Sequence, residues 1–157
     1  MNRLQKFARR HLWIYWQQWL GRNAISVRCA LSHRSLWFYL PEAITSHSSH
    51  LWLPLERAVH AGSNDLDGIT PEGQALIRAI RSWPEVVDRG IDLRPDYIAV
   101  HVHHEEDWRE VIPRIVGLIR YTFPRPDLRV RVMPPFDPAV PVWHRQLLEE
   151  LCGPLAP

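Results

Sequence analysis

Apolar residues between positions 25 and 151 change repeatedly between the two-residue period of a β-strand and the 3.6-residue period of an α-helix. This mixture predicts strands and helices within one folded domain. Two strand-type runs lie close together, on either side of a short break at 32–34, and this spacing predicts a β-hairpin. The strand-type runs are 25–31, 35–40, 97–102 and 128–133.

A first helix is marked by its cap as well as by its period. Thr70 stands before Pro71, which is typical of an N-cap followed by the first helical residue. Apolar residues at helical spacing then continue as far as Trp83, where Pro84 ends the pattern. The spacing therefore predicts a helix of about three turns, with one buried stripe.

Two more helical segments follow later in the chain. Apolar residues over 108–122 have helical spacing, but Pro113 lies inside this stretch and is expected to break or kink the helix. Pro141 can open a last helix, which carries three leucines between 147 and 151. The turn-rich composition of 41–70 predicts loops around a short apolar island at 51–55.

The fold class that follows is α+β. With 157 residues, 46% of them hydrophobic, and eight Trp, the chain can bury a core without disulfides or structural metals. We expect a small mixed β-sheet packed against two or three helices, with an N-terminal amphipathic helical extension. The predicted division is 1–24 for the extension and 25–157 for the domain. The sheet is expected to contain the regions of Val27, Leu36, Tyr97 and Val130.

The N-terminal segment has its own pattern. Over residues 2–20 the apolar side chains form one stripe at helical spacing and the basic side chains occupy another face, which predicts an amphipathic helix. Three roles are open for this helix. It packs on the protein's own core, it docks on a partner or a membrane interface, or it serves as an organelle presequence. The residues expected to dock are Arg3, Lys6, Arg9, Arg10, Trp13, Trp16 and Trp19.

Charge is distributed unevenly along the chain. Seven basic residues and no acidic residue precede Glu42, whereas 12 basic and 17 acidic residues follow, so the two parts carry +7 and −5. This asymmetry predicts that the N-terminal part faces a lipid surface, a nucleic acid or an acidic protein. No apolar run approaches the roughly 20 residues of a transmembrane helix. We expect an intracellular, cytoplasmic protein that is soluble or peripheral to a membrane, unless the N-terminus is an organelle address.

Residues that could carry chemistry are few. Cys29 and Cys152 lack the spacing of a zinc or redox motif, which favours two buried thiols. In the predicted strand, His101 and His103 share a face near Glu105, and two His with a carboxylate suit zinc or non-haem iron. The alternative is a strand that turns into a helix, with acids gathered at the helix N-terminus.

Signatures of catalysis are absent from the sequence, including the phosphate-binding, dinucleotide-binding, serine-hydrolase and zinc-protease motifs. We therefore expect a protein that is not an enzyme and needs no cofactor, with a bound metal ion as the alternative. Basic residues mixed with Trp near the N-terminus also suit single-stranded nucleic acid. A second small basic stripe is formed by Arg125, Arg129 and Arg131.

The stretch from Tyr97 to Ile119 resembles the N-terminal domain of the Nfu family, which comprises scaffold or carrier proteins for iron–sulfur clusters. The match consists of an aromatic-Ile-x-Val strand beginning at Tyr97, a short acidic turn, Asp107-Trp108, and Pro113 five residues after the Trp. Upstream, the helix expected over 71–83 and the following Pro-Glu-Val-Val are similar to the family's helix and its turn into a strand. The resemblance covers about 35–123.

Two departures limit what the resemblance implies. Glu85 stands where the family has the glycine of its turn, and this chain lacks the C-x-x-C of the family's separate cluster-binding domain. The resemblance implies a non-catalytic adaptor, either in iron–sulfur protein maturation or as an accessory subunit of a larger complex. A metal-binding protein that uses the histidine cluster and an Arg-rich nucleic-acid or ribosome-associated subunit are the alternatives.

Overall fold

The computed structural model describes residues 22–30, 32–45, 51–53, 68–87, 91–134 and 143–157. Six strands of this described part form one sheet, in the order β3-β4-β5-β2-β1-β6. Every neighbouring pair is antiparallel except β1 and β6, which are parallel, so the sheet is mixed. The strands are β1 (Ala24–Cys29), β2 (Ser35–Tyr39), β3 (Leu51–Leu53), β4 (Ile91–Arg94), β5 (Tyr97–His101) and β6 (Arg129–Val132).

The predicted α+β class is confirmed, and the predicted sheet is its centre. β1 and β2 form the expected hairpin, in which Val27 lies opposite Phe38. The four predicted regions are neighbours in the order β5-β2-β1-β6. The parallel pairing of β1 and β6 places Val27 beside Val132, although the two residues are far apart in sequence.

The sheet extends beyond the prediction at one edge. β4 was not predicted, although Ile91 and Leu93 alternate with charged residues in the two-residue period of a strand. It pairs with β5 through a two-residue turn at Pro95 and Asp96, and a Pro-Asp dipeptide between two such runs is a turn signal. β3, within the apolar island expected in a loop, pairs with β4. Residues 46–50 and 54–67 of that region lie outside the described part.

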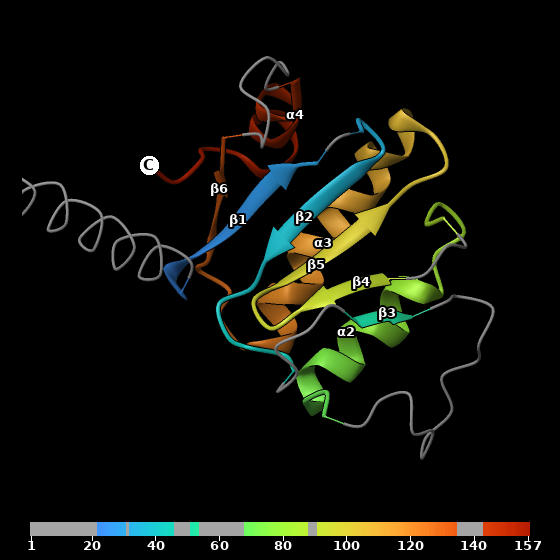
Figure 1. Ribbon diagram of the computed structural model, residues 1–157. Coiled ribbons are helices and arrows are strands. Elements are labelled where there is room, and N and C mark those ends of the chain that lie inside the picture. Colours follow the sequence, from blue (N-terminus) through green and yellow to red (C-terminus); the bar gives the residue numbers. More distant parts are fainter. Residues whose placement is uncertain (1–21, 31, 46–50, 54–67, 88–90, 135–142) are drawn as a thin grey trace, which may run out of the picture.

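Three α-helices and one 3-10 turn complete the described part: α2 (Pro71–Arg81), η2 (Glu105–Asp107), α3 (Trp108–Thr122) and α4 (Trp143–Cys152). The predicted N-cap is confirmed, since the Thr70 Oγ1 accepts the Gly73 N–H at 3.1 Å. Figure 1 shows α2 and α3 behind the sheet, where they cover one face. α4 packs on α3 and beside β6.

Pro113 does not break α3, which runs without interruption from Trp108 to Thr122, so the predicted break is wrong. Pro113 lies on the exposed side of the helix. The ring removes only the N–H that would bond to the carbonyl of Arg109, and that carbonyl belongs to an exposed residue. Water can satisfy this carbonyl, so the helix continues.

The core lies between the sheet and the helices. Trp108 is 0% exposed and packs on Phe38 with the ring centroids 6.3 Å apart. Its Nε1–H donates to the carbonyl of His33 at 2.8 Å, so the one polar atom of the indole is satisfied. Leu76 of α2 and Leu148 of α4 join the same cluster. All three helices therefore bury their apolar stripes against a single face of the sheet.

The N-terminal segment, residues 1–21, lies outside the described part, and so does the helix predicted over 2–20. β1 begins at Ala24, the last residue of the predicted extension. The guanidinium of Arg125 donates to the carbonyl of Arg22 and to the side chain of Asn23. These bonds attach the residues just before β1 to the turn that precedes β6.

Candidate functional site

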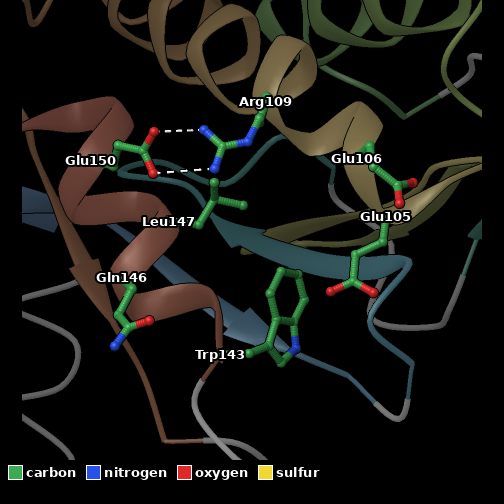
Figure 2. Close-up of a pocket in the computed structure, with 7 residues that line it drawn as sticks. All are labelled: Glu105, Glu106, Arg109, Trp143, Gln146, Leu147 and Glu150. Atoms are coloured by element: carbon green, nitrogen blue, oxygen red, sulfur yellow. Dashed lines mark hydrogen bonds and ion pairs between the residues drawn. The ribbon is translucent and has the colours of Figure 1, made fainter.

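A groove of about 480 Å³ lies between the start of α3 and the length of α4, and we call it the α3–α4 groove. Figure 2 shows it with Leu147 between an ion pair at one end and an indole at the other. The groove is a product of tertiary packing, because its two walls are some 40 residues apart in sequence. It is lined by Glu105, Glu106, Arg109, Trp143, Gln146, Leu147 and Glu150.

One end of the groove is closed by an ion pair that bridges the helices. Arg109 Nη1 donates to Glu150 Oε1 at 2.6 Å, and Nη2 donates to Oε2 at 3.3 Å, so the pair is bidentate (Figure 2). The hydrogen bonds from Arg109 lower the pKa of Glu150, and the same bonds raise the pKa of Arg109. Both side chains are exposed, so this pair orients α4 on α3 and contributes little to stability.

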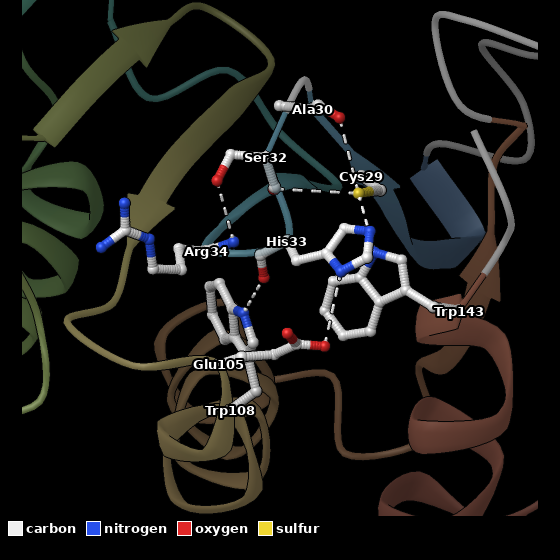
Figure 3. Close-up of polar contacts among 8 residues, drawn as sticks. All are labelled: Cys29, Ala30, Ser32, His33, Arg34, Glu105, Trp108 and Trp143. Carbon is white, nitrogen blue, oxygen red and sulfur yellow. Dashed lines mark hydrogen bonds and ion pairs between the residues drawn. The ribbon is translucent and has the colours of Figure 1, made fainter. Parts of the chain in front are cut away.

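The other end is formed by Trp143, which is held from two sides (Figure 3). Its Nε1–H donates to the Sγ of Cys29 at 3.2 Å, and its ring lies 4.9 Å from the ring of His33. His33 in turn contacts Glu105 at 3.5 Å between Nδ1 and Oε1. The indole is therefore fixed in place before any ligand arrives.

The thiol of Cys29 does not suit nucleophilic chemistry. Its side chain is fully buried, and its Sγ lies 3.5 Å from the carbonyl of Ala30, to which the thiol donates. Burial raises the pKa of Cys29, and the hydrogen bond from Trp143 only partly offsets this rise. A thiol kept protonated is a poor nucleophile and a poor metal ligand. Cys152 is half-buried, and both cysteines are free.

His144 follows Trp143 and is the most unusual polar residue of this region. It is 0% exposed, and neither ring nitrogen has a hydrogen-bond partner. Burial, followed by the charges of Arg145 and His33, lowers the pKa of His144 to about 4. The ring is therefore neutral at physiological pH, and it is buried at the N-terminal end of α4.

The predicted metal ligands are not assembled by the fold. In the part of the chain that the structure describes, no three His, Cys, Asp or Glu side chains come together as a metal site requires. β5 ends at His101, and the chain then turns into η2, where Glu105 faces His33 and not the predicted histidine partners. The alternative holds here, since the Asp107 carboxylate accepts the His104 N–H at 2.8 Å at the helix start.

The remaining predicted site residues divide into two groups. The docking residues of the N-terminal segment, from Arg3 to Trp19, lie outside the described part. Of the second basic stripe, Arg125 holds the residues before β1, and Arg129 donates to the carbonyl of Pro154 at 3.2 Å. These two arginines fasten the ends of the domain, and Arg131 is half-buried on β6.

Most residues of the α3–α4 groove were not predicted. Trp143, Gln146, Leu147 and Glu150 recur at three- and four-residue intervals, which marks one side of a helix. This spacing was the available signal, but it does not show which partner the side faces. Only Glu105 was predicted as a site residue, and it was assigned to a different role.

None of the helices in the described ranges combines the length and the apolar composition needed to cross a bilayer. No protein-family model, curated protein or solved structure matches this chain. The likeness to the Nfu N-terminal domain thus stays a prediction, carried by the residues between Tyr97 and Ile119.

Proposed function

We propose that this protein is a non-catalytic adaptor, and that it docks a positively charged segment of a partner protein in the α3–α4 groove. The observation that supports this proposal most directly is the composition of the groove, which combines carboxylates with a fixed indole. Grooves that bury a few side chains of an extended or helical segment are a common mode of partner recognition.

The charge of the groove favours a cationic ligand. Three carboxylates and one guanidinium line it. The guanidinium of Arg109 is already paired with Glu150, and Glu105 contacts His33. Glu106 is exposed on the rim beside them. Together these charged groups give the groove a net negative charge, which attracts Lys or Arg side chains and repels acidic segments.

Trp143 supplies a second contact for the same kind of ligand. A guanidinium or ammonium group placed over an indole face gains cation–π attraction of about 0.5–2 kcal/mol. Leu147 offers an apolar surface in the same groove, against which the methylene groups of Arg or Lys can pack. The site therefore suits a basic side chain better than a small polar metabolite.

The resemblance to the Nfu N-terminal domain supports a biological setting for this adaptor. It suits a role in iron–sulfur protein maturation, or a role as an accessory subunit of a larger complex. The N-terminal segment would be a second docking element, through Arg3, Lys6, Arg9, Arg10, Trp13, Trp16 and Trp19. It directly precedes the junction that Arg125 ties to the domain.

The groove can be tested with a fluorescein-labelled oligo-arginine peptide and an oligo-glutamate peptide of the same length, measured by fluorescence anisotropy. We expect the arginine peptide alone to bind. The double substitution Glu106→Lys with Gln146→Lys places two positive charges on the groove and should weaken binding by more than about ten-fold.

Glu149→Lys is the matched control, since Glu149 is exposed on α4 but does not line the groove. It should change the affinity by less than about three-fold. Equal losses in the control and in the double variant would show non-specific attraction to the protein's acidic surface, and the proposal would be abandoned.

A further inference from the structure

The sheet has a second face, on the side away from the helices. Strand alternation sends Ile25, Val27 and Phe38 to the core, so the residues between them point the opposite way. In Figure 1 no described helix crosses this side of the sheet. The second face is formed by Ser26, Arg28, Ser35, Trp37, Tyr39, Tyr97, Ala99 and Arg131.

Three aromatic rings form a continuous surface at the centre of the second face. Trp37 and Tyr97 are stacked, with ring centroids 4.4 Å apart and an interplanar angle of 9°. Tyr39 lies opposite Tyr97 in the strand register, with centroids 5.2 Å apart. Tyr97 is enclosed between the other two rings and is nearly buried, while Trp37 and Tyr39 are half-buried. Trp37 and Tyr39 are thus the two rings of this cluster that remain partly accessible.

Two arginines flank these rings on the neighbouring strands. Arg28 places its guanidinium carbon 5.7 Å from the centroid of Tyr39, in cation–π geometry. Arg131 of β6 lies opposite Ser26, which is two residues before Arg28 in β1. The two arginines therefore lie on the same side of the sheet. Burial lowers the pKa of Arg131, and the charge of Arg28 lowers it further, as expected for two cations at these neighbouring positions.

A buried hydroxyl lies between these cations and the rings. Ser26 is 2% exposed, and its Oγ has no hydrogen-bond partner. In the register it stands between Tyr39 of β2 and Arg131 of β6. Unpaired buried polar atoms are uncommon in folded proteins, and a ligand oxygen is one group that could pair with this one. Asp96 precedes Tyr97 in the β4–β5 turn, on the side of Tyr39 that is away from β6.

We propose that the second face of the sheet is a binding site for single-stranded nucleic acid, with bases on Trp37 and Tyr39 and a phosphate between Arg28 and Arg131. Base stacking on aromatic side chains of an open sheet, beside arginines that contact the backbone, is the usual physical basis of such recognition. The nucleic-acid strand would run from the rings toward β6, away from the carboxylate of Asp96.

Binding of a fluorescein-labelled single-stranded oligo-uridine to the full chain, measured by anisotropy, tests this site. Trp37→Leu and Tyr39→Leu keep an apolar side chain but remove a stacking surface, and each should weaken binding by roughly ten-fold. Arg28→Gln together with Arg131→Gln should flatten the dependence of log K on log salt by about 0.7, because the contact with one phosphate is lost.

Matched controls lie on the helical side of the molecule. Tyr121 is 86% exposed on α3, and Arg78 is exposed on α2. Tyr121→Leu and Arg78→Gln should leave both the affinity and the salt slope within error. Melting curves identify any variant that does not fold. If a variant does not fold, the unmodified chain is instead photo-crosslinked to an oligonucleotide that contains 5-iodouridine. The crosslink should map to the peptides of β2 or β5.

The basic N-terminal segment must be separated from this site. A variant with Arg3, Lys6, Arg9 and Arg10 changed to Gln should lose part of the affinity but keep the dependence on Trp37 and Tyr39. Absence of binding by the unmodified chain, crosslinks confined to residues 1–21, or equal losses in the Tyr121 and Tyr39 variants would each overturn the proposal.

Discussion

The two faces of the sheet are built from the same strands but differ in nearly every physical respect. On the helix-covered face, Val27 and Phe38 are 0% exposed and belong to the apolar core cluster, in which Phe38 packs on the Trp108 ring. On the second face, Arg28 and Trp37, which are adjacent in the register, are half-buried and combine charge with aromatic surface. A single alternating strand can therefore stabilise the fold with one side and present a binding surface with the other.

Replacement of a core indole should have the largest effect on this contrast. Trp108→Ala should lower the free energy of unfolding by about 3–5 kcal/mol, because it leaves a large cavity and an unsatisfied carbonyl at His33. Trp37→Ala on the second face should cost only about 1–2 kcal/mol. Urea unfolding of both variants measures the difference. Equal losses would mean that the second face is as tightly packed as the core.

A smaller effect is expected from pH, through the buried His144. Its pKa is about 4 in the folded protein, below the ordinary value of about 6.5 that applies when the chain is unfolded. Between these values the unfolded chain binds a proton that the folded protein excludes, so stability falls as the pH drops below about 6.5. At pH 5 the protonation of this ring in the unfolded chain should lower the free energy of unfolding by about 2 kcal/mol.

His144→Leu should remove this part of the acid sensitivity, whereas His104→Leu, at an exposed position, should keep it. Unfolding of both variants and of the unmodified chain at pH 7.5 and pH 5 provides the comparison. An unchanged pH dependence in His144→Leu would contradict the burial of a neutral ring.

Alanine substitutions at two helical glycines compare a packed side of a helix with an exposed side. Each should change the stability by about 1 kcal/mol. A Cβ on Gly73 would lie 2.8 Å from Ile69 Cγ2 and 2.9 Å from the carbonyl oxygen of Ile44. Gly73→Ala should therefore destabilise the protein by about 1 kcal/mol, since overpacking exceeds the gain in helix propensity. Gly117→Ala meets no atom within 4 Å and should stabilise by about 0.5–1 kcal/mol. Thermal melts that show the same sign for both would refute the assigned packing.

The smallest effect on stability is expected from removing the N-terminal segment. Deletion of residues 1–21 retains Arg22 and Asn23, which Arg125 holds, and should leave the melting temperature within error. The same deletion should abolish association with a protein partner if the segment is a docking element. A large drop in the melting temperature would show instead that the segment is part of the core.

Local patterns were sufficient to predict much of the fold. The β1–β2 hairpin, the Thr70 cap and the strand at Tyr97 depend on neighbours within a few residues, so their signals are present in the sequence itself. β4 carries the same kind of local signal, since its apolar and charged residues alternate, but this short alternation was missed. Pro113 was misjudged because the cost of a helical proline depends on which side of the helix it faces, and exposure is set by packing.

The candidate groove was less predictable for the same reason. The carboxylate of Glu105 could be named from the sequence, but its partner His33 lies in the distant turn of the β1–β2 hairpin and could not. The pairing of Arg109 with Glu150 and of Trp143 with Cys29 joins elements separated by the whole of β6 or by most of the chain. Contacts between distant elements depend on how those elements pack, and no local period records them.

What the sequence alone determined is therefore the kind and order of the elements, because hydrogen bonding and side-chain alternation within a helix or strand are local. Tertiary structure decided three further things: that β6 lies parallel to β1, that α4 meets α3 across an acidic groove, and that Tyr97 joins Trp37 and Tyr39 on one surface. Each of these requires burial of apolar area between segments far apart in the chain, and the free energy of that burial belongs to the whole fold.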